Sequence, residues 1–160
     1  MRTENQRRQS IFNVAGLVAL VVVLGGCQPS DRTPGLWLSG DVATTPADWS
    51  FSDQHREIYV QVDTPYFLPH SVTIWCAQLD GTLYIGARNP ESKNWVGWMD
   101  SRRDIRLKIG EQLFDVRAAD FDDEQTLTAL RAAYAEKYDL PKTPSSSAPP
   151  IRYWRIDARG

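Results

Sequence analysis

Two cysteines, Cys27 and Cys76, have the most distinctive chemistry of any side chains in this sequence. Cys27 directly follows two glycines, whereas Cys76 lies inside an apolar run. A catalytic thiol needs a base within reach, and the two histidines, His55 and His70, could supply one in space. Nothing in the sequence beside Cys76 argues for a lowered thiol pKa, so we expect this side chain to be a small buried hydrophobic group.

The stretch before Cys27 has the layout of a secretory signal. A start with three arginines leads into an uncharged apolar run of 11 residues, 14–24. As a helix this run measures about 17 Å, and a stable membrane span needs roughly 20 residues. The sequence therefore predicts an export signal over residues 1–26 rather than a permanent transmembrane helix.

The tetrapeptide Leu24-Gly25-Gly26-Cys27 resembles the lipobox of bacterial lipoproteins. The resemblance implies that Cys27 is diacylated and becomes the first residue of a mature, membrane-anchored chain in the cell envelope. Gln28 stands where many Gram-negative lipoproteins carry a retention aspartate, which implies the periplasmic face of the outer membrane for such a host. Two alternatives stay open: an ordinary signal with an incidental cysteine, and twin-arginine export through Arg7-Arg8.

The mature chain is mildly acidic and long enough for one domain. Removal of residues 1–26 takes away three arginines and one glutamate, which leaves 15 Lys and Arg against 19 Asp and Glu, or about −4. This charge gives no support to a nucleic-acid partner. Prolines and glycines after Cys27 predict a flexible tether over 27–47, followed by a domain over 48–160 with a Pro/Ser-rich loop at 141–150.

Alternating apolar residues predict a sheet-rich domain. The runs share one face at every second residue, and Asp80-Gly81 joins two of them as a tight hairpin turn. A second hairpin turns at Gly110-Glu111. The alternating faces are Ile58/Val60/Val62, Val72/Ile74/Cys76, Leu83/Ile85/Ala87 and Ile105/Leu107/Ile109, with a further strand after Glu111 and a last one at 151–157.

Helical spacing appears twice. Leu127, Leu130, Tyr134 and Tyr138 predict a helix from about Asp123, with Asp122 as its N-cap and Gln125 as the capping partner. A short helix is expected within 92–101. Six antiparallel strands with few helices favour a closed or nearly closed barrel, because closure removes exposed edges. We therefore expect a β-rich α+β domain: a six-stranded antiparallel barrel with one short and one longer helix.

The segment 72–95, extended by 100–110, resembles the split β-barrel of the pyridoxamine 5′-phosphate oxidase-like and deazaflavin-dependent reductase superfamily. The resemblance spans roughly 57–138. It implies a cofactor, FMN or deazaflavin, and a homodimer with the site at the subunit interface. Arg88, Lys93, Asn94 and Trp95 match the positions that grip the cofactor phosphate.

Further residues match the ring pocket and its entrance. By the same resemblance, Thr73 and Trp75 line the ring pocket, and His70 could contact a ligand or substrate. A phosphate is bound by cations and by amides at a helix N-terminus, so these residue types suit the role. An Arg and a Lys near Asn89-Pro90 are also common on any solvated turn, and buried tryptophans are common in cores.

These observations leave two functional hypotheses open. The first is a flavin-type oxidoreductase that transfers hydride to a small molecule and needs few catalytic side chains of its own. The second is a non-catalytic envelope module that keeps the barrel without cofactor and binds a small ligand or a protein partner. We find no glycine-rich nucleotide loop, no metal-ligand spacing and no Gly-x-Ser-x-Gly nucleophile in the sequence.

Overall fold

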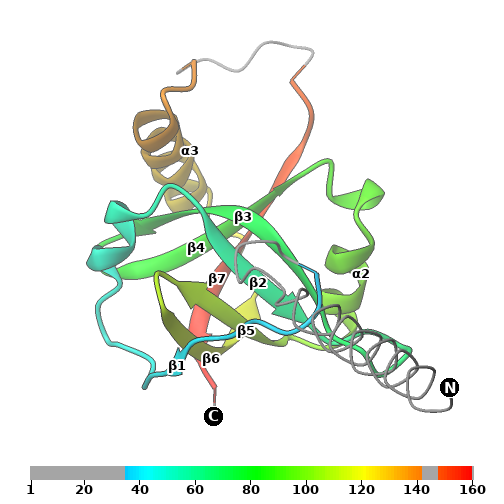
Figure 1. Ribbon diagram of the computed structural model, residues 1–160. Helices are drawn as coiled ribbons and strands as arrows, with labels where there is room; N and C mark the ends of the chain where they lie inside the picture. The colour runs from blue at the N-terminus through cyan, green and yellow to red at the C-terminus, as the bar shows by residue number, and fades with distance from the viewer. Residues whose placement is uncertain (1–34, 142–147, 160) are drawn as a thin grey trace, which may run out of the picture. The chain divides into compact units, whose positions relative to one another are not determined.

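A computed structural model describes residues 35–141 and 148–159 of the chain (Figure 1). Seven strands dominate these residues, with two α-helices and two short 3-10 helices between them. Cys27 and the predicted signal lie outside the described residues, as does most of the Pro/Ser-rich loop. The strands are β1 Asp41–Val42, β2 Ile58–Val62, β3 His70–Leu79, β4 Thr82–Arg88, β5 Asp104–Ile109, β6 Gln112–Ala119 and β7 Ile151–Ala158.

Six of these strands close into an antiparallel barrel. The neighbours run β6-β5-β2-β3-β4-β7, and a further β6–β7 pairing returns the sheet to its start. β1 is the extra strand and pairs in parallel with the first residues of β6. The predicted fold class is therefore confirmed. Closure pairs the two end strands of the sheet with each other and so reduces the exposed strand edge, which is the physical advantage of this architecture.

The predicted hairpins form where the turn residues allow them. Asp80 and Gly81 both adopt positive φ, at 49° and 79°, as a two-residue turn between β3 and β4 requires. Gly110, with φ of 60°, turns β5 into β6. The inward faces of the strands then fill the barrel, where Ile58, Leu83 and Trp154 have no exposed surface.

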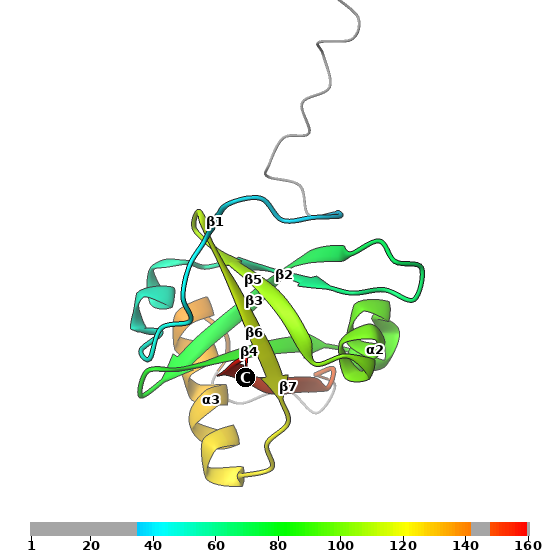
Figure 2. The same cartoon turned by 90° about the horizontal axis from the view of Figure 1, so that it is seen from below.

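Two helices pack beside the barrel. The short helix α2 covers Asn94–Ser101, and the longer helix α3 covers Glu124–Tyr138. The 3-10 helices η1, Ser50–Gln54, and η2, Pro90–Ser92, precede β2 and α2. Asp123, rather than the predicted Asp122, caps α3 and accepts a bond of 2.6 Å from the Thr126 amide. Figure 2, seen from below, places α3 and α2 on opposite sides of the barrel.

The described part of the predicted tether, residues 35–47, makes contacts with the barrel. The Asp41 amide donates to the Glu111 carbonyl at 2.9 Å, and the Ala43 amide donates to Leu113 at 2.8 Å. The Leu38 amide donates to the Gln61 side chain at 2.7 Å. These are mostly backbone bonds, so the Pro- and Gly-rich composition of the segment does not oppose them.

Within the described residues, no helix combines the length and the apolar character needed to cross a bilayer.

Candidate functional site

The outer face of β3, β4 and β7 carries several of the predicted site residues. Register fixes their arrangement, because Trp75 on β3 lies opposite Gly86 on β4, and Gly86 lies opposite Tyr153 on β7. Arg88 lies two residues beyond Gly86, about 7 Å along the strand, and is paired with the half-exposed Ile151. Helix α3 covers the other end of this face, through contacts that include Tyr84 and Tyr134.

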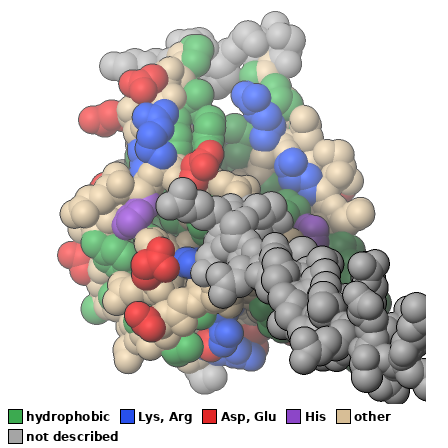
Figure 3. Space-filling view, viewed as in Figure 1, with side chains coloured by type: hydrophobic (Ala, Val, Ile, Leu, Met, Phe, Trp, Pro, Cys, Tyr) green, Lys and Arg blue, Asp and Glu red, His purple; other side chains and the backbone are tan. Residues whose placement is uncertain are grey.

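A cleft of about 400 Å³ opens beside Trp75, lined by Arg56, Glu57, Trp75 and Tyr138. The Trp75 side chain is 41% exposed, and its ring stacks on Tyr138 with centroids 4.2 Å apart and planes 6° apart. Figure 3 shows hydrophobic side chains between the ridge of α3 and the ridge formed by η2 and α2, with Lys or Arg on both ridges. The volume falls within the usual range for small-molecule sites.

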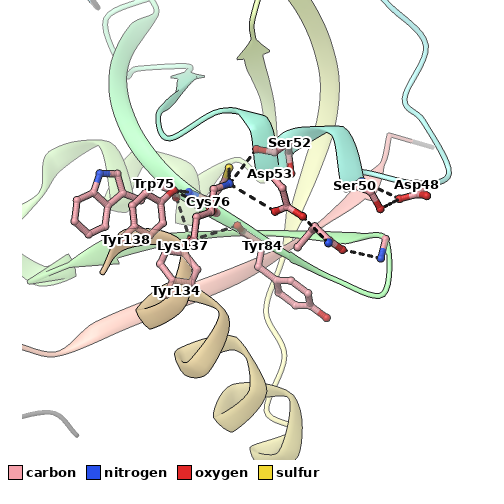
Figure 4. Close-up of polar contacts among 12 residues, drawn as sticks. Asp48, Ser50, Ser52, Asp53, Trp75, Cys76, Tyr84, Tyr134, Lys137 and Tyr138 are labelled. Carbon is pink, nitrogen blue, oxygen red and sulfur yellow. Dashed lines mark hydrogen bonds and ion pairs between the residues drawn. The ribbon is translucent and has the colours of Figure 1, made fainter. Parts of the chain in front are cut away.

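The hydroxyl of Tyr138 fixes this platform to the sheet. It donates to the Cys76 carbonyl at 2.8 Å and accepts from the Cys76 amide at 2.9 Å (Figure 4). The hydroxyl of Tyr134, one turn earlier on α3, donates to the Trp75 carbonyl at 3.0 Å. Burial raises the pKa of both phenols, so both remain protonated donors at neutral pH.

Cys76 itself faces the barrel core and is fully buried. The Lys137 ammonium lies 3.6 Å from its sulfur, and it also donates to the Ser52 carbonyl at 2.9 Å. Burial raises the pKa of the Cys76 thiol, and the nearby Lys137 charge offsets this only in part. Cys76 is therefore a protonated core residue rather than an activated nucleophile.

The cations of the described chain are almost all paired. Thirteen lysines and arginines lie in the described residues, and eleven have a carboxylate oxygen within 4.0 Å. Within that part of the chain, Arg88 and Lys93 are the two without such a partner, and both are exposed. Two cations that lack a carboxylate partner can bind an anion without first breaking an ion pair.

The turn between Arg88 and Lys93 has a defined shape. Asn89 adopts a left-handed φ of 50°, and its amide donates to the Pro150 carbonyl at 2.8 Å. Pro90 begins η2, after which Lys93 occupies the N-cap position of α2 and Asn94 begins that helix. The outer end of β4 and the N-terminus of α2 are thus held by a short, ordered connection.

The other predicted site residues are distributed differently. Thr73 is exposed on β3, on the same face as Trp75. Trp95 is only 7% exposed and packs in the core, where its ring centroid lies 6.2 Å from that of Trp154. Its ring therefore offers no free surface for stacking. His70 packs edge-on against Trp98 at 5.4 Å, away from the Trp75 cleft. Thr73, Trp75 and Arg88 therefore share one face, which Lys93 and Asn94 follow along the chain.

A family model matches residues 51–151, which include the cleft, Arg88 and Lys93. The chain belongs to the DUF2255 family. That family is described as an uncharacterized protein conserved in bacteria. No curated protein sequence matches the chain.

Solved structures show which fold this DUF2255 member shares. The conserved hypothetical protein Rv2991 from Mycobacterium tuberculosis is 15% identical, with a TM-score of 0.53 over 69% of this chain and 77% of that chain. An F420 reductase is 12% identical, with a TM-score of 0.51 over 72% and 96%. HutZ, the heme storage protein from Vibrio cholerae, is 10% identical, with a TM-score of 0.50 over 69% and 87%. At these identities the likeness establishes the split-barrel fold alone.

The sequence did not identify three of the four cleft residues. Tyr138 appeared only as one apolar position of a helix, and Arg56 and Glu57 precede the first barrel strand without any motif. The contacts that unite them join α3, β3 and the start of β2, which are far apart along the chain. Tyr138 is the one that a signal could have found, since a tyrosine that ends an apolar helical stripe can bring a hydroxyl to the sheet.

Proposed function

We propose that this protein is an envelope lipoprotein whose split barrel binds FMN or a deazaflavin on the outer face of β3 and β4. The observation that carries the proposal is the pair of unpaired cations, Arg88 and Lys93, beyond the exposed ring of Trp75. A flavin-type cofactor has a planar ring system and a phosphate joined by a flexible chain. A stacking surface and an anion site about 7 Å apart along a strand fit these two parts.

The residues present fit such a ligand. Trp75 is stacked on Tyr138 through one face of its ring and is 41% exposed, so it can extend the stack with another aromatic ring. Arg88 and Lys93 would hold the phosphate, with the first amides of α2 beside them. Thr73 offers a hydroxyl on the same face. When bound, the cofactor supplies the hydride chemistry, and the chain's own groups bind and orient it.

Cofactor titration tests this proposal. FMN and a deazaflavin would be added in turn to the purified protein, with binding followed by flavin fluorescence. We expect micromolar affinity, and a loss of about a hundredfold in an Arg88→Glu/Lys93→Glu variant, since hydrogen bonds to charged groups contribute about 1.5–3 kcal/mol each. Arg159→Glu is the matched control, because Arg159 is exposed but pairs with Asp104. If neither cofactor binds at micromolar concentration, the proposal fails.

A second function is favoured by one observation, the composition of the cleft. It contains Arg56 and Glu57 but no histidine, and two of its four residues are aromatic. This lining also suits a non-catalytic module that captures a small aromatic ligand and keeps the barrel without cofactor. Such a module should tolerate charge reversal at Arg88 and Lys93, whereas Trp75→Ala should abolish its binding.

Membrane attachment through Cys27 is the other half of the proposal. Diacylation of Cys27 would place the domain in the cell envelope, on the periplasmic face of the outer membrane in a Gram-negative host. Intact-mass measurement of the protein from the membrane fraction tests it, with Cys27→Ser as the control. Light scattering on the detergent-solubilised protein tests the homodimer that the fold resemblance implies.

A further inference from the structure

Exposed apolar side chains gather near the start of the described chain. Eight large hydrophobic side chains are exposed in the described residues, and five of them belong to two short segments. The first segment holds Leu36 and Trp37, and the second holds Tyr66, Phe67 and Leu68 in the loop between β2 and β3. We refer to these five residues as the aromatic patch. Phe67, at 95% exposed, is its most prominent member.

Two hydrogen bonds bring the two segments of the aromatic patch together. The Gly35 amide donates to the Ser71 hydroxyl at 2.8 Å, and the Ser71 amide donates to the Gly35 carbonyl at 3.2 Å. Leu36 and Trp37 therefore begin beside the base of the β2–β3 loop. Figures 1 and 2 both draw the start of the described chain next to this hairpin.

The loop presents its apolar tip in a fixed conformation. The Thr64 hydroxyl donates to the Leu68 carbonyl, and the Phe67 amide donates to the Thr64 carbonyl at 3.4 Å. Phe67 adopts a φ of 65°, an uncommon conformation for a residue with a bulky side chain. Behind the tip, the Tyr66 ring packs edge-on against Trp98 at 5.8 Å. The contact between Tyr66 and Trp98 thus holds the loop, while the Phe67 side chain stays exposed to solvent.

The two segments of the patch carry no charged side chain, and the carboxylates that adjoin them in sequence are Asp41, which is exposed, and Asp63. Residues 64–69 contain no charged side chain, and neither do residues 35–40. Asp63, which precedes the loop, pairs with Arg102 at 2.7 Å. No unpaired carboxylate in either segment would therefore repel an anionic surface.

Five side chains are too few for a stable protein interface, which needs about 800 Å² on each partner. A lipid surface sets a lower requirement, because an anchor at Cys27 would already hold the domain at the bilayer, and a weak second contact is then enough to orient it. Tryptophan and tyrosine are also the side chains that favour the boundary between water and lipid. The residue types and the size of the patch both favour a membrane over a protein partner.

We propose that the aromatic patch docks onto the surface of the membrane that holds the protein, with Phe67 and Leu68 entering the boundary between headgroups and acyl chains. The inference rests on the proposed anchor at Cys27. Gly35 follows Cys27 by eight residues, so the contour of the chain allows at most about 29 Å between anchor and patch. Docking fixes the orientation of the barrel on the bilayer, which a single anchor alone does not.

Spin labelling of the lipoprotein in phospholipid vesicles tests the docking. A nitroxide would be attached at Phe67→Cys, and at Val42→Cys as the matched control, since Val42 is an equally apolar residue of β1 that is 71% exposed. Cys76 is fully buried and will not react, and labelling of the chain without an added cysteine checks this. Collisions are measured with oxygen, which concentrates in the bilayer, and with a water-soluble nickel chelate.

We expect the ratio of oxygen to nickel collisions to be several-fold higher at residue 67 than at residue 42. Equal ratios on protein whose mass includes the diacylglycerol would overturn docking while leaving the anchor intact. Shielding of residue 67 from both probes would indicate a second protein copy on the patch, which also overturns docking. If Cys27 carries no lipid, added vesicles decide: a raised ratio at residue 67 supports docking without an anchor, and an unchanged ratio overturns it.

Discussion

Tyr138 ends α3 where the pairing between β2 and β3 stops, and its hydroxyl takes the place of a missing strand partner. The β2–β3 register ends at Ile58 and Ile74, so Cys76, two residues further along β3, has no partner on β2. The Tyr138 hydroxyl bonds both the Cys76 amide and its carbonyl, at 2.9 Å and 2.8 Å. Substitution Tyr138→Phe should remove both bonds and keep the ring stacked on Trp75.

The expected cost follows from these two bonds. Each buried backbone group left without a partner costs about 1–3 kcal/mol. Because the ring remains and Tyr138 lines an open cleft that water can enter, we take the lower part of this range for the pair. Tyr138→Phe should therefore destabilise the protein by about 2–3 kcal/mol, measured as a shift of the midpoint in urea unfolding with an unchanged slope.

Tyr153→Phe is the matched control. Tyr153 is 7% exposed against 5% for Tyr138, and its hydroxyl bonds no other described residue. This change should cost less than about 0.5 kcal/mol, as is usual where no specific contact is lost. If the two variants have the same unfolding free energy, the hydroxyl of Tyr138 does not complete the sheet and the reasoning is refuted.

Three further outcomes are expected from the packing and the ionisable groups. Gly86→Ala should destabilise the protein by about 1–3 kcal/mol, because the new Cβ would lie 3.0 Å from the Tyr153 ring. Gly97→Ala, on the open surface of α2, should instead stabilise the protein by about 0.5–1 kcal/mol. Urea unfolding measures both changes. Burial raises the pKa of Tyr84, Tyr134, Tyr138 and Tyr153 above 10, so their contribution to stability is complete below pH 10 and should be lost as the pH rises further; unfolding midpoints above pH 9 test this. Arg106 and Arg155 lower the pKa of Asp115 and Asp157, so stability should fall as the pH drops below 4, and neutralising Asp115→Asn should reduce that slope.

The barrel could be predicted because its signals are local and repeated. The sequences of β2, β3, β4 and β5 show the two-residue period, and Asp80-Gly81 is a favoured pair for a two-residue hairpin turn. β1 could not be predicted this way, because its attachment to β6 uses backbone groups that any residue carries. The capping residue moved from Asp122 to Asp123 because two adjacent aspartates present the same signal.

The candidate site was only partly predictable. Thr73, Trp75 and Arg88 lie on one face because register, once fixed by the hairpin, sets their positions. Helix α2 turns the Trp95 ring into the core beside Trp154, and its predicted place at the cofactor phosphate stays a prediction. The cleft also depends on Tyr138, which α3 brings to β3 from 62 residues further along the chain.

The outer face of β3, β4 and β7 carries two kinds of side chain that are uncommon on the rest of the described surface, namely exposed apolar groups and unpaired cations. Most large apolar side chains of the described residues are buried and most of their cations are paired, and consistency of that kind is what stabilises a single fold. Trp75 and Ile151 are two of the eight exposed large apolar side chains in the described residues, and Arg88 and Lys93 are the two cations there without a carboxylate partner. Strand register pairs Arg88 with Ile151 and places Arg88 two residues after Gly86, which is the partner of Trp75. A short ordered turn then leads from Arg88 to Lys93. The ligand that we propose, an aromatic ring with an anionic group, would contact both kinds of side chain.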